Sequence, residues 1–550
     1  MKIGILQHNP VSGYCQGNSE NLVGMVEKAA AMGADLCIAP ELALCGPNAG
    51  DLFFRQDFIA SCRLWMEAMA KSLQARGLPP LLLGAPVPNP VPGGKPLHNC
   101  AVLVSHGELS VIGRKVILPS DHAMNDVCYF EPGISPGVLQ IRGWRLAVTI
   151  GEDIWNNAPM ENGEHSPGPD PVSEVMEASG GDILVNLAAL PYTMGVQTRC
   201  QRLVHWLARR HHVPVITVNC SGGCDSLIFH GGSLACDGEG NLLAEAPLFE
   251  ESVLVVDLAA RERQEPLPLP REEKLWKALV LGTRDFIHKS GFSRAILGLS
   301  GGVDSALVAA IAAEALGPEN VMVVAMPSVY SSQGSVADSV ALAGNLGLEL
   351  KKVPIAPAFD GYRTMFDAVF GRLEGLTEEN IQARIRGAIL MAFANEHNSV
   401  VLNTGNKSEA ACGYCTLYGD QVGALGVIGD LYKHQVYSLC HWYNATHGPI
   451  IPEAILSKEP SAELSPGQKD SDSLPPYAVL DSILALILEK RKSVEAIVAD
   501  GHDRQTVSRV LAMVQRARFK RQQAPTGLRV SDSALNVVWN TPIAGKVVFE

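Results

Sequence analysis

The chain has few charged residues and no long apolar run, and each shortage excludes a class of protein. Charged residues make up 18% of its 550 positions, and no dense run of lysine or arginine occurs. The formal charge of -13 argues against a nucleic acid partner, because phosphate backbones bind basic surfaces. No apolar stretch has the length of a membrane span, and the first residues read as a short strand rather than a signal peptide. We expect a cytoplasmic protein with no membrane partner.

The cysteines do not form the pattern of a disulfide framework. There are 13 of them, an odd number, and they are scattered along the chain. Cys412 and Cys415 form one CxxC pair, but a second pair at a spacing that would complete a metal site is missing. The pattern is typical of reduced thiols in the cytoplasm and does not favour a metal role for this pair.

The chain does contain enough apolar material for two large folded units. Hydrophobic residues make up 47% of the sequence, and 550 residues exceed one ordinary core. Around residues 261–271, charged residues and alternating prolines replace the periodic apolar pattern, and we interpret this stretch as a linker. We therefore predict two α/β domains, residues 1–260 and residues 272–550.

The order of predicted strands and helices differs between the two domains. In the first domain, helices alternate with short strands, which predicts a layered α/β sandwich. Its predicted helices include residues 18–32 and 198–211, and its strands residues 2–7, 36–39, 81–84, 101–105, 146–150, 183–185 and 215–218. The second domain begins with strands at residues 295–299, 321–325 and 350–353 that alternate with helices at residues 304–316 and 332–346. That order predicts a doubly wound parallel sheet, which binds ligands beyond the carboxyl ends of its strands.

The first strand of the second domain runs into a glycine-rich turn and then into an alanine-rich helix. The turn reads Gly298, Leu299, Ser300, Gly301, Gly302, Val303, Asp304 and Ser305. Glycines let the backbone approach a polyanion, the serines add hydroxyl donors, and the helix directs its free N–H groups toward the same anion. The lysine of a Walker A loop is missing, and Asp304 would repel phosphate unless a divalent cation lay between them. The segment predicts a site for Mg-ATP whose pyrophosphate leaves as a unit.

Later segments of this domain place polar side chains among turn residues. We expect a helix to begin with Thr377 as its cap and to present Arg384 and Arg386 to anionic groups. Further polar residues after a predicted strand at residues 400–402 are Thr404, Lys407, Glu409, Asp420, Lys433 and Glu463. Their occurrence in one doubly wound domain favours a common site.

Together these motifs resemble those of the glutamine-type NAD synthetases, in which a nitrilase-like amidase precedes a synthetase. The resemblance rests on GLSGGVDS (298–305), TEENIQARIRG (377–387), NTGNKSE (403–409), GYCTLYGD (413–420), PSAEL (460–464), DSLPPY (472–477) and FKRQQAP (519–525). It implies a nitrilase-like αββα sandwich and a synthetase of the N-type ATP pyrophosphatase kind, which is similar to the adenine nucleotide alpha hydrolases. That family adenylates the carboxylate of deamido-NAD with Mg-ATP, releases pyrophosphate, and lets ammonia convert the acyl-adenylate to NAD and AMP.

The resemblance also implies roles for single residues and an assembly of at least two copies. The implied ATP and Mg²⁺ ligands are residues 298–305 with Thr404 for ATP, and Asp304 with Glu409 for Mg²⁺. The implied deamido-NAD ligands are Asn380, Glu409 and Lys520, with Arg384 and Arg386 nearby. Lys407 and Lys433 are candidate catalytic cations, since a carboxylate that attacks a phosphate needs positive charge on the phosphate oxygens.

The first domain resembles the glutaminase that supplies ammonia in this family, but its nucleophile is missing. Glu41 and Lys115 match two members of the Glu-Lys-Cys triad, and Gly151 stands at the position of the cysteine. Glycine has no side chain that could form a thioester. Further departures from the family's glutamine contacts are Asp121, Val196 and Cys224. We therefore predict a pseudo-glutaminase, and a synthetase that uses ammonia rather than glutamine hydrolysed in the same chain.

Two other functions stay open at this point. One is a working glutamine-dependent synthetase with a nucleophile elsewhere, for which Cys128 and Cys224 lie in suitable loops. Neither stands at the strand end that aligns a thiolate with Glu41 and Lys115, and misplacement lowers the rate steeply. The other is a non-catalytic nucleotide-binding scaffold, which would bind ATP without releasing pyrophosphate.

Overall fold

The computed structural model divides the chain into two compact units, Met1–Leu269 (unit 1) and Pro270–Glu550 (unit 2). It describes residues 1–119, 124–156, 168–259, 263, 269–535 and 541–545. Most of the predicted linker and the position of Asp121 lie outside the described residues. None of the helices in the described part of the chain is long and apolar enough to cross a membrane.

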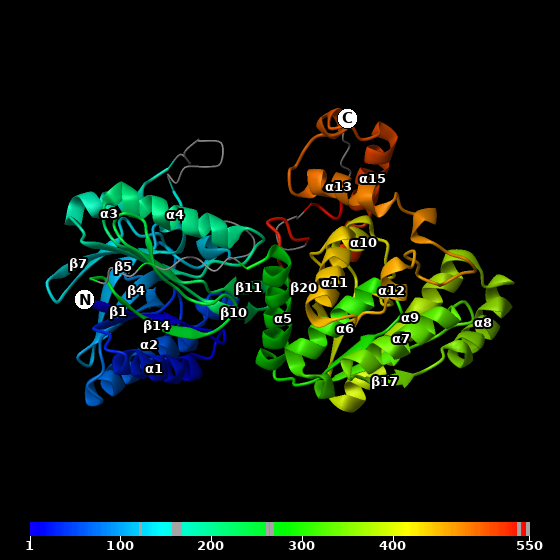
Figure 1. Cartoon of the computed structure of the whole chain (residues 1–550), viewed down its shortest axis with the longest axis horizontal. Helices are drawn as coiled ribbons and strands as arrows, with labels where there is room; N and C mark the ends of the chain where they lie inside the picture. Colours follow the sequence, from blue (N-terminus) through cyan, green and yellow to red (C-terminus); the bar gives the residue numbers. More distant parts are fainter. Residues whose placement is uncertain (120–123, 157–167, 260–262, 264–268, 536–540, 546–550) are drawn as a thin grey trace. The chain divides into compact units, whose positions relative to one another are not determined.

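Unit 1 contains two six-stranded sheets (Figure 1). The first sheet has the order β14-β1-β2-β3-β4-β5, with β1 (Lys2–Gln7), β2 (Leu36–Ile38), β3 (Leu81–Pro88), β4 (Leu97–Ser105), β5 (Glu108–Arg114) and β14 (Ser252–Asp257). The second has the order β13-β12-β9-β8-β7-β6, with β6 (Gly137–Ile141), β7 (Trp144–Ile150), β8 (Ile183–Ala188), β9 (Val215–Asn219), β12 (Leu234–Cys236) and β13 (Leu242–Glu245). A separate hairpin pairs β10 (Ser221–Cys224) with β11 (Leu227–His230).

The two sheets pack face to face with helices outside them. Buried apolar residues of both sheets, such as Ile5 and Val185, share one core cluster. The helices α1 (Cys15–Ala31) and α2 (Gln56–Ala75) cover the first sheet, and α3 (Pro171–Ser179) and α4 (Val196–His211) cover the second. The predicted αββα sandwich is therefore confirmed. The core strands read as nearly continuous apolar runs because both of their faces are covered.

Unit 2 is built on one parallel sheet of order β17-β16-β15-β18-β19-β20. Its strands are β15 (Ala295–Gly298), β16 (Val321–Ala325), β17 (Glu349–Lys352), β18 (Val400–Asn403), β19 (Leu425–Gly426) and β20 (Thr526–Gly527). The chain moves from β15 to β17 in one direction and then returns past β15 to β18. Right-handed crossovers therefore place helices on both faces of the sheet, which confirms the doubly wound fold. The switch point lies between β15 and β18, where such sheets bind ligands.

The helices of unit 2 follow from their patterns of apolar residues. The helix α6 (Val303–Leu316) is apolar on nearly all sides and is buried among the sheet, α5 (Arg271–Lys289) and α11 (Lys433–His447). The other helices are α7 (Gln333–Leu346), α8 (Ala356–Phe370), α9 (Gly375–His397), α10 (Lys407–Cys412), α12 (Glu453–Ser457), α13 (Tyr477–Leu488), α14 (Val494–Ala499), α15 (Arg504–Arg516) and α16 (Arg518–Arg521). In Figure 1, α13 and α15 lie side by side, and with α14 they share a core with α10.

One predicted helix start is wrong. The sequence predicts that Thr377 caps the helix, but α9 already begins at Gly375 with Glu374 as its cap residue. Thr377 therefore lies inside the first turn. Glu374 makes no capping hydrogen bond through its side chain, so the chain has no strong capping signal at this point.

Candidate active site

The glycine-rich turn joins the carboxyl end of β15 to the start of α6. Gly301 has a φ of +77°, and a Cβ atom there would lie 2.3 Å from the carbonyl oxygen of Ser335. Only glycine fits this position, because a side chain would be strained and would collide with backbone. The buried Ser305 hydroxyl donates to the Gly302 carbonyl oxygen at 3.1 Å and accepts the Ser300 N–H at 3.3 Å. Ser305 thus braces the turn, whereas Ser300 is exposed beside it.

Beside this turn in space, a lysine bridges two carboxylates. Lys433 Nζ lies 2.5 Å from Asp304 Oδ2 and 3.2 Å from Glu409 Oε1. The Asn406 amide donates to Asp304 Oδ1 at 2.9 Å, and its oxygen accepts the Glu409 N–H at 3.0 Å. Asn406 is the cap residue of α10, so the start of that helix fixes the distance between the two acids. The structure therefore brings the two predicted Mg²⁺ ligands to one point.

Burial and the neighbouring charges together set the pKa values in this cluster. Burial raises the pKa of Glu409 to about 7, because the loss of hydration outweighs the attraction of Lys433, and the nearby Asp304 adds repulsion. Burial alone would lower the pKa of Lys433, but the carboxylates of Asp304 and Glu409 reverse that effect and raise it. The lysine thus stays charged at neutral pH.

The turn and the ion cluster line one cavity of about 300 Å³. Its volume is that of a small-molecule site. The predicted site residues in its wall are Gly298, Leu299, Ser300, Gly302, Val303, Asp304, Arg386, Thr404, Glu409 and Lys433. Burial lowers the pKa of Arg386 to about 10, although Glu463 and Asp420 oppose the shift, and its Nε atom donates to the Met326 carbonyl oxygen at 3.1 Å.

The predicted deamido-NAD ligands Asn380, Arg384 and Lys520 converge on another feature, residues 413–417. Lys520 Nζ donates to two backbone carbonyl oxygens of this segment at 2.9 and 2.7 Å. Arg384 Nε donates to a third at 3.2 Å, and Asn380 Oδ1 accepts from the Thr416 hydroxyl at 2.6 Å. These three side chains hold a segment that reaches the cavity wall through one of its members, Tyr414.

Lys407, a predicted catalytic cation, points elsewhere. Its side chain is fully buried, and Nζ lies 2.8 Å from both Asp430 Oδ1 and the Ser531 hydroxyl. The ammonium also lies 4.8 Å from the centre of the Tyr432 ring. Lys407 therefore forms a buried ion pair in the protein core rather than part of the cavity wall.

Sequence reasoning did not single out Asn406 in the ion cluster, nor Asp470 and Lys458 in the cavity wall. Asn406 could have been found, because an Asn three residues before a Glu at a helix start is a capping box. Asp470 lines the cavity and accepts from the Tyr477 hydroxyl at 2.8 Å. It lies in a short turn with no periodic pattern, so the sequence carries no comparable signal for it.

Unit 1 contains a second bridging lysine. Lys115 Nζ lies 2.6 Å from Glu41 Oε1 and 2.8 Å from Asp126 Oδ2, and no side chain of the three is more than 2% exposed. Asn99 also donates to Glu41 Oε1 at 2.8 Å. Burial raises the pKa of Glu41. Burial alone would lower the pKa of Lys115, but Glu41 and Asp126 reverse that effect and raise it.

Gly151 lies directly against this pair. It follows β7 with a φ of +55° in the left-handed region. A Cβ atom at this position would lie 2.6 Å from Glu41 Oε2 and 2.9 Å from Lys115 Nζ. The three positions of the predicted triad thus meet in space, and the side chains of Glu41 and Lys115 occupy the volume that a nucleophile would need.

The cysteines around this site have other neighbours. Cys224 Sγ lies 3.1 Å from the Ser12 hydroxyl, and Cys128 ends a short helical turn that begins at Asp126. The structure adds a third thiol, Cys220, which is buried in an apolar cluster and donates to the Glu41 carbonyl oxygen at 3.7 Å. Apolar surroundings disfavour the reactive thiolate. In the described part of the chain, no group of three His, Cys, Asp or Glu side chains converges on a metal-binding geometry.

Comparisons with known proteins match nearly the whole chain. A family model described as NAD synthase matches residues 275–524. The chain is 43% identical to the glutamine-dependent NAD(+) synthetase of Synechocystis sp. over 98% of both chains. It is 38% identical to the enzyme of that name from Thermotoga maritima over 99% of both chains.

Solved structures give the same result. The glutamine-dependent NAD+ synthetase of Acinetobacter baumannii, solved with ADP, is 32% identical, with a TM-score of 0.76 over 98% of both chains. A glutamine-dependent NAD(+) synthetase of Cytophaga hutchinsonii has a TM-score of 0.82 at 20% identity and supports the fold alone.

Proposed function

Because the chain belongs to the glutamine-dependent NAD(+) synthetase family, we propose that it is a ligase that forms NAD from deamido-NAD, ATP and ammonia. The observation that carries this proposal is the Asp304-Lys433-Glu409 cluster in the wall of the cavity beside the glycine-rich turn. It unites groups that suit a phosphate-cleaving ligase: the start of a helix, a fixed cation and carboxylates that could hold a metal ion.

The carboxylates of Asp304 and Glu409 suit Mg²⁺. Each is 18% exposed, and both face the cavity, so an ion there keeps positions for phosphate oxygens and water. Mg²⁺ is usually held by one or two carboxylates together with substrate phosphates. When bound, it would neutralise the triphosphate and polarise the phosphorus that is attacked.

The protein groups then supply the first step. The carboxylate oxygen of deamido-NAD attacks the α-phosphorus of ATP, and the bond to the leaving pyrophosphate breaks. No general base is needed, because the substrate carboxylate is already ionised. The turn's N–H groups and Lys433, whose pKa is raised, stabilise the negative charge on the phosphate oxygens.

In the second step ammonia attacks the carbonyl carbon of the acyl-adenylate. The new C–N bond forms, the bond to AMP breaks, and the nitrogen loses one proton. Residues 413–417, held by Asn380, Arg384 and Lys520, form the part of the site that we assign to deamido-NAD. Lys520 and its neighbours would therefore act through this segment.

We further propose that unit 1 does not release ammonia from glutamine. Residue 151 has no thiol, and the side chains of Lys115 and Glu41 occupy the volume around it. Cys220 is the thiol in contact with Glu41, but it touches the backbone carbonyl from an apolar cluster. The nitrogen would come from free ammonia. A homo-oligomer of at least two copies remains a prediction from the resemblance, and a cytoplasmic location remains a prediction from the sequence composition.

The purified full chain tests this function with deamido-NAD, Mg-ATP and an ammonium salt. We expect NAD, AMP and pyrophosphate in equal amounts. ATP binding without pyrophosphate release would contradict the proposal and support the scaffold alternative.

A further inference from the structure

The cavity of unit 2 has too little positive charge for the substrates that the proposed function assigns to it. Among the described residues in its wall, the basic ones are Arg386, Lys433 and Lys458. Six residues in the same wall are acidic: Asp304, Glu409, Asp420, Glu459, Glu463 and Asp470. A triphosphate and a dinucleotide would both be repelled unless some of these charges pair internally and a basic group is released to the substrate.

Lys433 and Arg386 are already engaged. Lys433 is shared between two carboxylates, and Arg386 donates through Nε to a backbone carbonyl oxygen. Lys458 differs, because it pairs with a single carboxylate. Its ammonium donates to Glu463 Oε1 at 2.8 Å and to the Ser335 hydroxyl. An ammonium has three N–H donors, so the described residues leave one of them for a ligand.

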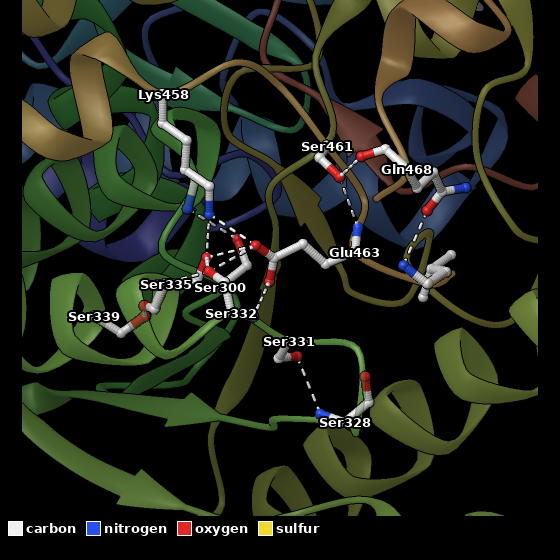
Figure 2. A network of polar contacts seen from close by, with 12 residues as sticks. Ser300, Ser328, Ser331, Ser332, Ser335, Ser339, Lys458, Ser461, Glu463 and Gln468 are labelled. Carbon is white, nitrogen blue, oxygen red and sulfur yellow. Dashed lines mark hydrogen bonds and ion pairs between the residues drawn. The ribbon is translucent and has the colours of Figure 1, made fainter. Parts of the chain in front are cut away.

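Glu463 sits where several donors converge, as Figure 2 shows. Its carboxylate accepts from the hydroxyls of Ser335 and Ser332 at 2.7 and 3.1 Å, and from the Ser332 N–H at 3.3 Å. Burial opposes its ionisation, but Lys458 and Ser335 more than offset that effect and hold its pKa below the usual range. A carboxylate of the chain itself therefore occupies a group of donors that would also suit a phosphate oxygen.

These donors lie against the glycine-rich turn. A Cβ atom on Gly301 would reach the Ser335 carbonyl oxygen at 2.3 Å, and the Ser339 hydroxyl, one turn further along α7, donates to the Leu299 carbonyl oxygen at 3.4 Å. The first turns of α7 and the phosphate turn are thus in direct contact. Ser300, which lines the cavity, appears beside Lys458 and Ser335 in Figure 2.

We propose that Lys458 is a further phosphate-binding residue of this cavity, and that Glu463 is an internal anion that yields its place on Lys458 to a phosphate oxygen of the substrate. The inference deepens the proposed function, on which it rests. It supplies a lysine that the turn itself lacks. Glu463 keeps the ammonium in place before the phosphate arrives and competes with the phosphate afterwards, which favours the release of pyrophosphate.

Pyrophosphate binding, measured by calorimetry with Mg²⁺ on the full chain, tests this exchange without requiring turnover. We expect Lys458→Met to weaken binding about tenfold, the value of roughly one charge-assisted hydrogen bond. The matched control is Lys492→Met, because Lys492 pairs with Asp500 on the surface of unit 2, where both side chains are 37% exposed and neither lines the cavity. The control should bind within about twofold of the unchanged protein.

The variant Glu463→Gln tests whether Glu463 exchanges with phosphate on Lys458 or has only a structural role. If the carboxylate competes with phosphate, its loss should tighten pyrophosphate binding severalfold, whereas a merely structural residue would weaken it when replaced. Equal affinity of the Lys458→Met and Lys492→Met proteins would overturn the proposal, and so would weaker binding by Glu463→Gln. If pyrophosphate binding changes as expected but the unchanged protein forms no NAD, the proposed function fails while the phosphate role of Lys458 stands.

Discussion

Each unit contains a lysine between two carboxylates, but the surroundings of the two clusters differ. In unit 1, Lys115 and its partners Glu41 and Asp126 are at most 2% exposed. In unit 2, Lys433 is also buried, but Asp304 and Glu409 are each 18% exposed and line a cavity. The same charge arrangement is thus closed off in the core of unit 1 and open to a cavity in unit 2.

The glycine-containing turns beside the two clusters, at Gly301 in unit 2 and Gly151 in unit 1, also differ. Gly301 lets the turn of unit 2 press against α7, and neighbouring residues of this turn line the cavity. Gly151 also follows a strand with a positive φ, but it stands where a reacting side chain would have to project. Glycine therefore shapes the turn in unit 2, whereas in unit 1 it leaves the predicted nucleophile position without a side chain.

The largest effect should come from breaking the cluster of unit 2. Asp304→Ala should lower pyrophosphate release about 10³-fold, because a metal ligand and the partner of Lys433 are lost together. Circular dichroism should show an unchanged fold, since Asp304 lies at the cavity wall. Near-normal turnover of this variant would contradict the assigned role.

Breaking the cluster of unit 1 should change stability rather than chemistry. Lys115→Met leaves two buried carboxylates without their cation, which should cost about 3–5 kcal/mol of unfolding free energy in a denaturant titration. Arg63→Met is the matched control, because Arg63 pairs with Glu67 on the surface and should cost less than about 1 kcal/mol. Below the unfolding transition, ammonium-dependent NAD formation by Lys115→Met should match that of the control; a specific loss would show that unit 1 takes part in the reaction.

The predictability of the two clusters from sequence also differed. The family resemblance implied the roles of Asp304 and Glu409, and Lys433 was a candidate catalytic cation. All three lie at the start of a helix, where the parallel sheet brings side chains together. The succession of strands and helices along the chain and the layered class of both folds followed from apolar patterns. The buried pairing of Lys407 with Asp430 did not, since burial of a lysine depends on long-range packing that no local pattern records. Asp126, which pairs with the buried Lys115, was missed for the same reason.

A smaller effect is expected at the glycine of unit 1. Gly151→Cys restores the thiol but places Cβ against Glu41 and Lys115 at a positive φ, so it should lose about 1–3 kcal/mol of stability. We expect no glutamate release from glutamine, because the catalytic pair must move to admit the side chain. Appreciable glutaminase activity would mean that the site can still open.

The smallest effect should arise within unit 2, at Lys520. Lys520→Ala removes two hydrogen bonds to residues 413–417, and we expect the KM for deamido-NAD to rise about fivefold, equivalent to about 1 kcal/mol. The KM for ATP should stay constant, because the hydrogen bonds of Lys520 go to residues 413–417 and not to the glycine-rich turn. A shift in both constants would argue against a separate dinucleotide region.

Isotope transfer distinguishes the two units most directly. The full chain is given deamido-NAD and Mg-ATP with glutamine labelled with ¹⁵N at its amide, or with ¹⁵N-ammonium in a parallel reaction, and the NAD is analysed by mass spectrometry. We expect labelled NAD from ammonium and no NAD from glutamine alone. Labelled NAD from glutamine would show that unit 1 is a working glutaminase, and the absence of NAD from ammonium would show that unit 2 is not the ligase.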